Sequence, residues 1–238
     1  MTRHHLHNHS ILRRVRRVAA SLAVIGGLTV AGGAVGGDHA GAAPATTSSV
    51  IADAAERAVS ALERWQQTQN PVDYVWFVQR RDQVALMTEQ GIELSRGTLR
   101  EEWSQVAVPK QHALLNAVSQ LGVPYRSMKS EPGVGFDCSG LTIWAFGAAG
   151  MQLPRISRDQ INDAERVDRD EAEAGDLVYY PGHVSIFLGA DMMVHSPNSG
   201  NHVEVRALPG RSLRFGDAAA ALGIVDLTVD VTPVEDAH

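Results

Sequence analysis

Residues 135–141 read Gly135-Phe136-Asp137-Cys138-Ser139-Gly140-Leu141 and contain the only cysteine of the 238-residue chain. From Cys138 to Ala149 the sequence has no helix breaker except glycine, which predicts a helix that begins at the cysteine. Free backbone N–H groups in the first turn favour a thiolate over a thiol and can stabilise an oxyanion. A single thiol forms no internal disulfide, so Cys138 is either an inert buried side chain or a nucleophile. Its neighbours Asp137 and Ser139 favour the nucleophile, because an inert cysteine is more often surrounded by aliphatic residues.

A thiolate nucleophile needs a base, and the base needs an orienting partner. The runs 183–188 and 192–195 are β-prone and flank a turn at Gly189-Ala190-Asp191, which predicts a hairpin. In a hairpin centred on Gly189, His183 and His195 are directly opposed on one face, so their imidazoles can touch. We therefore expect these two histidines to provide the base for Cys138 and the partner that orients it. His202 fits no such geometry and is expected at the surface.

The order of helical and β-prone segments predicts the fold class. Apolar spacing typical of helices is followed by short runs typical of strands. The expected helices span 50–69, 72–90, 98–107 and 111–121, and the expected strands span 177–180, 183–188, 192–195, 203–205 and 224–231. Helices first and strands afterwards indicate an α+β fold with an antiparallel sheet.

The segment before residue 43 has the pattern of a signal peptide. Five arginines and no acidic residue lie within residues 1–17, a mostly apolar stretch covers 18–35, and Ala40-Gly41-Ala42 forms an A-x-A site. We expect cleavage after Ala42, export to the cell wall or medium, and no stable membrane span after cleavage; an uncleaved membrane anchor is the alternative. The remaining division is a linker over 43–49, a helical region over 50–109 and a catalytic domain over 110–238.

Composition and charge exclude several classes of protein. The chain is 44% hydrophobic and 20% charged, which is too apolar for a wholly disordered protein. Its formal net charge of −6 becomes −10 without residues 1–42, because five arginines and one aspartate leave with them. An acidic chain gives no reason to expect a nucleic-acid partner. The helical region carries no recognisable chemistry, so its aromatic residues are expected in a core, with a docking module for a protein partner as the alternative.

From about Gln111 to Asp217 the chain resembles the NlpC/P60 family of cell-wall cysteine peptidases, which have a papain-like fold. The resemblance is carried by six segments in order, namely Gly122-Val123-Pro124-Tyr125, Gly135 to Leu141, Gly150-Met151-Gln152-Leu153-Pro154-Arg155, Ala174 to Tyr180, Gly182 to Gly189 and Met193-Val194-His195-Ser196-Pro197. One segment departs from the family. Where the family typically has Trp-Gly-Gly after Pro-Tyr, this chain reads Arg126-Ser127-Met128-Lys129-Ser130, which puts the shape of the cleft rim and the substrate preference in doubt.

The resemblance implies a role for each matching residue. Cys138 is the nucleophile, His183 the general base and acid, and His195 the residue that orients His183. The resemblance also implies that Tyr125 lines the site and helps to stabilise the oxyanion, and that Asp137 and Ser139 help to hold the donor peptide. Arg155 receives no role. The implied substrate is a peptidoglycan stem peptide, cut between the γ-carboxyl of D-glutamate and a diamino acid such as diaminopimelate, with no cofactor.

Three other functions compete with this prediction. A Cys and two His can ligate zinc, although no motif places a fourth ligand. A catalytically silent wall-binding scaffold would use the helical region to dock a partner. Within the enzymes, an N-acetylmuramoyl-L-alanine amidase or an acyl transferase could use the same residues.

Overall fold

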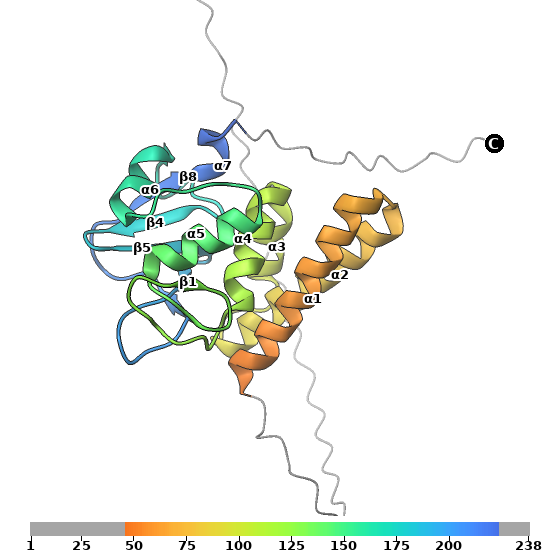
Figure 1. Cartoon of the computed structure of the whole chain (residues 1–238). Helices are drawn as coiled ribbons and strands as arrows, with labels where there is room; N and C mark the ends of the chain where they lie inside the picture. The colour runs from red at the N-terminus through yellow and green to blue at the C-terminus, as the bar shows by residue number, and fades with distance from the viewer. Residues whose placement is uncertain (1–45, 224–238) are drawn as a thin grey trace, which may run out of the picture. The chain divides into compact units, whose positions relative to one another are not determined.

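The structure is a computed structural model that describes residues 46–223. The predicted signal peptide and the predicted strand at 224–231 lie outside these residues. Four helices come first, α1 (Thr47–Thr68), α2 (Pro71–Gly91), α3 (Thr98–Gln105) and α4 (Val108–Ser119), and α5 (Cys138–Ala148) follows (Figure 1). The other elements are β1 (Ser130–Glu131), β2 (Gly135–Phe136), α6 (Ser157–Asp163), β3 (Glu165–Val167), β4 (Leu177–Tyr180), β5 (His183–Gly189), β6 (Met192–His195), β7 (Glu204–Ala207), β8 (Arg214–Asp217) and α7 (Ala218–Ala221).

The first two helices form an antiparallel hairpin, and the sequence supplies a capping residue at the start of each helix. The Thr46 side chain accepts a hydrogen bond from the Ser49 amide, so α1 begins inside the segment predicted as a linker. Asn70 caps α2, and Pro71 occupies its first turn, where its missing N–H needs no partner. α1 packs against both α2 and α4. None of the helices within residues 46–223 combines the length and the apolar character needed for a membrane crossing.

The main sheet is antiparallel throughout, with strand order β3-β8-β4-β5-β6-β7. β5 lies near its centre and is buried along its whole length. α5 packs against β5, and α4 packs against α5 (Figure 1). The fold is α+β, as the order of segments predicted. Strands β3 and β8 and helices α6 and α7 had no counterpart in the sequence prediction.

The hairpin of β5 and β6 forms, but its predicted register is wrong. Ile186 opposes Val194 and Phe187 opposes Met193, so that continuing the ladder places Ser185, not His183, opposite His195. The cause is the turn, which is centred on Ala190 and Asp191 rather than on Gly189 and is preceded by a register shift between Phe187 and Gly189. The offset of two residues keeps both histidines on the same face, since side chains alternate with a period of two. They are diagonal neighbours rather than an opposed pair.

Two contacts join helices α3 and α4 to the sheet. The indole Nε1 of Trp103 in α3 donates a hydrogen bond of 2.7 Å to the Leu188 carbonyl oxygen at the end of β5. The ammonium of Lys110 in α4 lies 2.8 Å from Asp176 and 2.6 Å from Asp217, which flank the sheet. The helical region and the sheet therefore share one continuous core rather than meeting only through a linker.

Candidate active site

Cys138 is the first residue of α5, as predicted, and is partly exposed. Asp137 precedes it as the helix cap, and its carboxylate accepts a 2.7 Å hydrogen bond from the Gly140 amide. The thiol therefore lies in the first helical turn, where backbone N–H groups point out of the helix. This position offers hydrogen-bond donors to an oxyanion.

Asp137 and Ser139 are held by an arginine whose role the sequence did not indicate. Arg155 donates one hydrogen bond of 2.5 Å to the Asp137 carboxylate and one of 2.7 Å to the Ser139 hydroxyl. The Met128 amide donates to the same carboxylate, at 2.8 Å. Asp137 is only 8% exposed and Ser139 only 6%, so both side chains are occupied mainly by protein partners.

The two predicted histidines meet in the sheet. His183 Nε2 lies 2.9 Å from His195 Nδ1, with the rings nearly perpendicular at 84°. Burial lowers the pKa of both side chains to about 4; the other imidazole adds to this for His183, and the positive charge of Arg206 does so for His195. Both rings are therefore neutral at pH 7, and one of them must donate to the other.

Glu204 extends this pair and was missed in the sequence. It opposes His195 across β6 and β7, and its carboxylate Oε1 lies 3.4 Å from His195 Nε2. Arg206 on the same strand lies 3.5 Å from that oxygen. The run Val203-Glu204-Val205 was predicted as a strand, but its register against β6 depends on the irregular segment 196–203, which sequence periodicity does not determine.

Tyr180 packs against the histidine pair. Its ring stacks on His183 with centroids 4.9 Å apart, and it opposes His183 across the turn at Pro181-Gly182. Burial raises the pKa of Tyr180, the Arg211 guanidinium above its ring lowers it, and the charge of Cys138 raises it. The helix that begins at Cys138 packs against β5, the strand that begins at His183. The two-residue Pro-Gly turn was the sequence signal that could have placed Tyr180 here.

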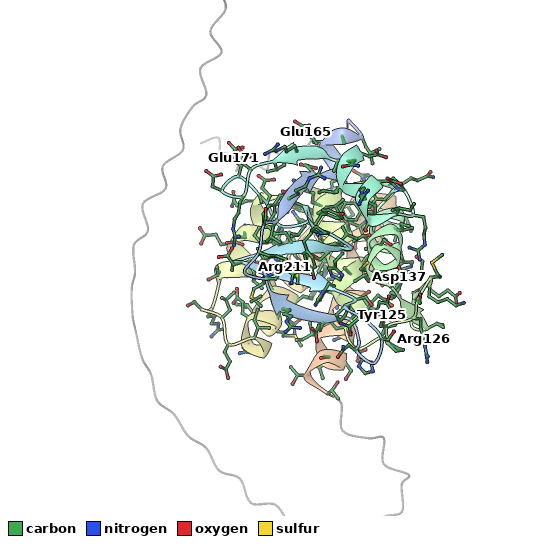
Figure 2. The ribbon with its side chains drawn as sticks, turned by 90° about the vertical axis from the view of Figure 1, so that its left-hand side faces the viewer. Tyr125, Arg126, Asp137, Glu165, Glu171 and Arg211 are labelled. Atoms are coloured by element: carbon green, nitrogen blue, oxygen red, sulfur yellow. The ribbon has the colours of Figure 1, made fainter. Side chains whose placement is uncertain are left out.

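Tyr125 lies beside the segment that leads into the cysteine helix. Burial raises the pKa of its hydroxyl, and the charges of Asp137 and Cys138 raise it further. A parallel bridge to Phe136 holds its backbone beside the strand that leads into α5. Figure 2 shows Tyr125 and Asp137 on one face of the molecule, with Arg211 also on it. The segment that departs from the family pattern begins at Arg126, which lies next to Tyr125 (Figure 2).

The two other histidines within residues 46–223 are separate from this site. His202 is exposed, as predicted, and pairs by a backbone bridge with Pro124. His112 is buried in α4, and its Nε2 has no hydrogen-bond partner among the described residues. Within residues 46–223 no group of three or more His, Cys, Asp or Glu side chains is arranged to hold a metal ion.

Comparison with known proteins places this region in a family. The NlpC/P60 family model matches residues 122–214. The peptidoglycan endopeptidase RipB of Mycobacterium tuberculosis is 39% identical over 111 residues, which are 40% of this chain and 46% of that protein. The bifunctional muramidase/DL-endopeptidase CwlT of Bacillus subtilis is 40% identical over 92 residues, which are 35% of this chain and 28% of that protein. The chain thus spans less than half the length of these curated relatives.

Among solved structures, the P60 domain of the Mycobacterium avium subspecies paratuberculosis antigen MAP1204 is 29% identical and gives a TM-score of 0.42, covering 46% of this chain and 94% of that one. RipD of M. tuberculosis, described as a non-catalytic NlpC/p60 domain protein, is 26% identical with a TM-score of 0.42. The match covers 47% of this chain and 98% of RipD. The part of the chain that carries Cys138, His183 and His195 thus matches the NlpC/P60 family model.

Proposed function

We propose that the chain is a cysteine endopeptidase that hydrolyses amide bonds in peptidoglycan stem peptides. The observation that carries the proposal is Cys138 at the start of α5, a helix that packs against β5, the strand from which His183 forms a buried, neutral pair with His195. Relatives named as peptidoglycan endopeptidases support the substrate class. By resemblance, the bond is the one between the γ-carboxyl of D-glutamate and a diamino acid such as diaminopimelate.

The hydrogen bonds around His195 assign a tautomer to each histidine in this mechanism. The Glu204 carboxylate only accepts hydrogen bonds, so His195 Nε2 carries a proton and donates it toward Oε1. His195 Nδ1 then has a lone pair and accepts from His183 Nε2–H. His183 Nδ1 is therefore unprotonated, and it is the nitrogen left to accept the proton of Cys138. Glu204 and His195 act as positioning residues, and His183 acts as the base.

The reaction then proceeds in two steps, formation of a thioester and its hydrolysis. The thiol proton of Cys138 passes to His183, and the sulfur forms a bond to the amide carbon. His183 returns that proton to the leaving amine as the C–N bond breaks, which leaves a thioester on Cys138. A water molecule gives a proton to His183 and attacks the thioester, and the acid leaves as the thiol is restored. N–H groups of the first turn of α5 stabilise the oxyanion in both halves, with the Tyr125 hydroxyl as a further donor.

Asp137 and Ser139 remain candidates for holding the donor peptide. Arg155 and backbone amides already take up much of the Asp137 carboxylate. We therefore assign Asp137 chiefly to fixing the start of α5 beside Tyr125, with the peptide contacting the oxygen edge that stays exposed. Arg155 positions both Asp137 and Ser139.

The decisive experiment digests defined soluble muropeptides and identifies the products by mass. We expect the parent chain to give two peptides whose masses add up to substrate plus one water, cut after D-glutamate. Cys138→Ala is expected to abolish turnover while its circular dichroism spectrum stays unchanged, and His202→Ala, which alters an exposed histidine, is the matched control. Full activity in Cys138→Ala, or products broken only between sugars, would contradict the proposal.

The same digestion separates the rival functions. Release of the intact peptide from the muramoyl lactyl group would identify an amidase, and incorporation of an added amine into the product would identify an acyl transferase. No turnover by the parent chain would favour the wall-binding scaffold. Stoichiometric zinc in the purified protein would favour a metal site.

We also propose that residues 1–42 export the chain, that it acts in the cell wall or medium, and that residues 110–238 form its catalytic domain. N-terminal sequencing of the protein recovered from outside the cell tests the first point. We expect it to begin at Ala43, and a chain that still begins at Met1 would identify an uncleaved anchor. The helical region, residues 50–109, is the proposed place for a further partner of the enzyme.

A further inference from the structure

The outer face of the α1–α2 hairpin contains a groove whose lining is unusual for this chain. Both helices contribute side chains spaced by three, four and seven positions, which places each set on one face of its helix. The groove has a volume of about 350 Å³ and is lined by Arg57, Ser60, Ala61, Arg64, Asp73, Trp76 and Arg80. It is a feature of the helical region, for which the sequence indicated no chemistry.

The groove is positively charged on an acidic protein. It has three arginines to one carboxylate, and that carboxylate already accepts a 2.6 Å hydrogen bond from the Thr68 hydroxyl. Among residues 46–223 no acidic side chain lies within ion-pair distance of Arg57, Arg64 or Arg80. The chain as a whole carries a net charge of −6. A local cluster of unpaired guanidinium groups is complementary to an anionic ligand.

Apolar surface adjoins these arginines. At the start of α2, Val72 is 60% exposed, Val75 52% and Trp76 53%. Their spacing of three and four positions places them on one face of the helix. A contiguous exposed apolar stripe marks a binding surface more often than a solvated face. The preferred ligand therefore combines carboxylates with apolar or sugar surface.

The groove is separate from the catalytic site. α1 packs on α4, and α4 packs on α5, so that α4 lies between the groove-bearing hairpin and the helix of Cys138 (Figure 1). A ligand in the groove would touch none of Cys138, His183 or Tyr180.

We propose that this groove is a second, non-catalytic docking site for peptidoglycan, in which the arginines bind carboxylates of stem peptides that are not being cut. The inference rests on the proposed function. A glutamate linked through its γ-carboxyl leaves its α-carboxylate free, so the polymer presents a negative charge at every such linkage. Attachment at the groove raises the effective concentration of neighbouring stem peptides at Cys138. It also allows an acidic enzyme to remain on an anionic polymer.

The binding test uses the whole chain carrying Cys138→Ala, so that nothing is digested, sedimented with purified insoluble peptidoglycan freed of covalently attached phosphate polymers. We expect the triple substitution Arg57→Gln, Arg64→Gln and Arg80→Gln to weaken binding at least fivefold and to reduce its salt dependence. The matched control Arg96→Gln, Arg100→Gln and Arg166→Gln removes three exposed arginines outside the groove and is expected to bind as the parent does. Equal binding by both triples overturns the inference. So does weakening seen only when the phosphate polymers are present, because the ligand is then phosphate.

The kinetic test uses chains with Cys138 intact. The groove triple is expected to raise the KM for insoluble peptidoglycan severalfold and to leave the hydrolysis of a small soluble muropeptide unchanged. Equal loss on both substrates overturns the inference, because the substitutions then act on the fold or the site. If the parent chain hydrolyses neither substrate, the proposed function fails, whereas the sedimentation result still decides whether the groove binds the polymer.

Discussion

Glu204 determines which nitrogen of His183 is unprotonated in the proposed mechanism, because it is linked to His183 through His195 by two hydrogen bonds. A side chain that accepts a hydrogen bond from His195 Nε2–H keeps His183 Nδ1 unprotonated. A side chain that only donates would reverse the sequence of donors and acceptors along the pair. Glu204 is partly exposed, with 40% of its side chain accessible, so substitutions there can change this hydrogen bond without removing core packing.

We therefore expect Glu204→Lys to lower kcat by roughly tenfold or more, since correct base catalysis contributes about a hundredfold or more. KM for a soluble muropeptide is expected to change little. Glu204→Gln, whose amide oxygen can still accept from His195 Nε2, is the matched variant and should keep most of the activity. Nitrogen NMR shifts of the imidazoles check the cause, because they report which ring nitrogen carries the proton. Unchanged tautomers in Glu204→Lys would refute the assignment.

At the scale of single elements, the β5–β6 turn shows what sequence patterns can and cannot predict. The alternation of β-prone runs correctly predicted two strands and a tight turn, and therefore one face for His183 and His195. It missed the register because the two central turn residues, Ala190 and Asp191, have φ values of 49° and 58°. Two-residue hairpin turns of this kind favour Asn-Gly, so Ala-Asp is a poor local signal. The contact that supports the turn comes from α3, far away in the sequence.

The helix α3 holds this turn at two points. Trp103 binds the Leu188 carbonyl oxygen, and the Glu102 carboxylate approaches Gly189 so closely that a Cβ there would lie 1.6 Å from Oε2. Burial raises the pKa of Glu102, and the backbone N–H of Ala190 lowers it by favouring the charged form. Long-range support of this kind allows a non-glycine residue to keep a left-handed conformation that otherwise costs about 1–2 kcal/mol.

The turn should therefore accept a better local sequence. We expect the double substitution Ala190→Asn and Asp191→Gly to raise the free energy of unfolding by about 1 kcal/mol, measured by urea denaturation. Loss of the exposed Arg169–Asp191 ion pair subtracts little from this gain. Ala190→Val, in which a β-branched side chain takes the same φ, is the opposite control and should destabilise. A double variant less stable than the parent would contradict the strain argument.

At the scale of the whole molecule, the sequence predicted the order of layers but not how they are joined. Cap residues, proline positions and apolar periodicity are local, and they correctly indicated helices α1 to α5 and the central strands. The contacts that join the layers are not local in the sequence. Lys110 bridges carboxylates more than 60 residues away in sequence, and Arg155 reaches back to Asp137 across α5. Such contacts depend on the packed fold, so no spacing rule reveals them.

Three buried histidines distributed over the fold make the whole molecule sensitive to acid. Burial lowers the pKa of His112 to about 4, and the pKa values of His183 and His195 are also about 4. In the unfolded chain a histidine has a pKa near 6.5. Between these values the unfolded state binds more protons than the folded state, so the free energy of unfolding falls as the pH falls from about 6.5 to about 4. Each independent histidine contributes up to about 1.4 kcal/mol per pH unit in this window.

His112 separates this effect from catalysis because it lies in α4, away from the histidine pair. We expect His112→Leu to reduce the slope of unfolding free energy against pH by about one proton between pH 6.5 and 4. At pH 7 the substitution should be close to neutral, since it removes a buried Nε2 that has no partner among the described residues. His202→Gln, at an exposed position, is expected to keep the parent slope. Urea denaturation at a series of pH values gives the answer, and a parental slope in His112→Leu would show that His112 is not the buried neutral group that the fold implies.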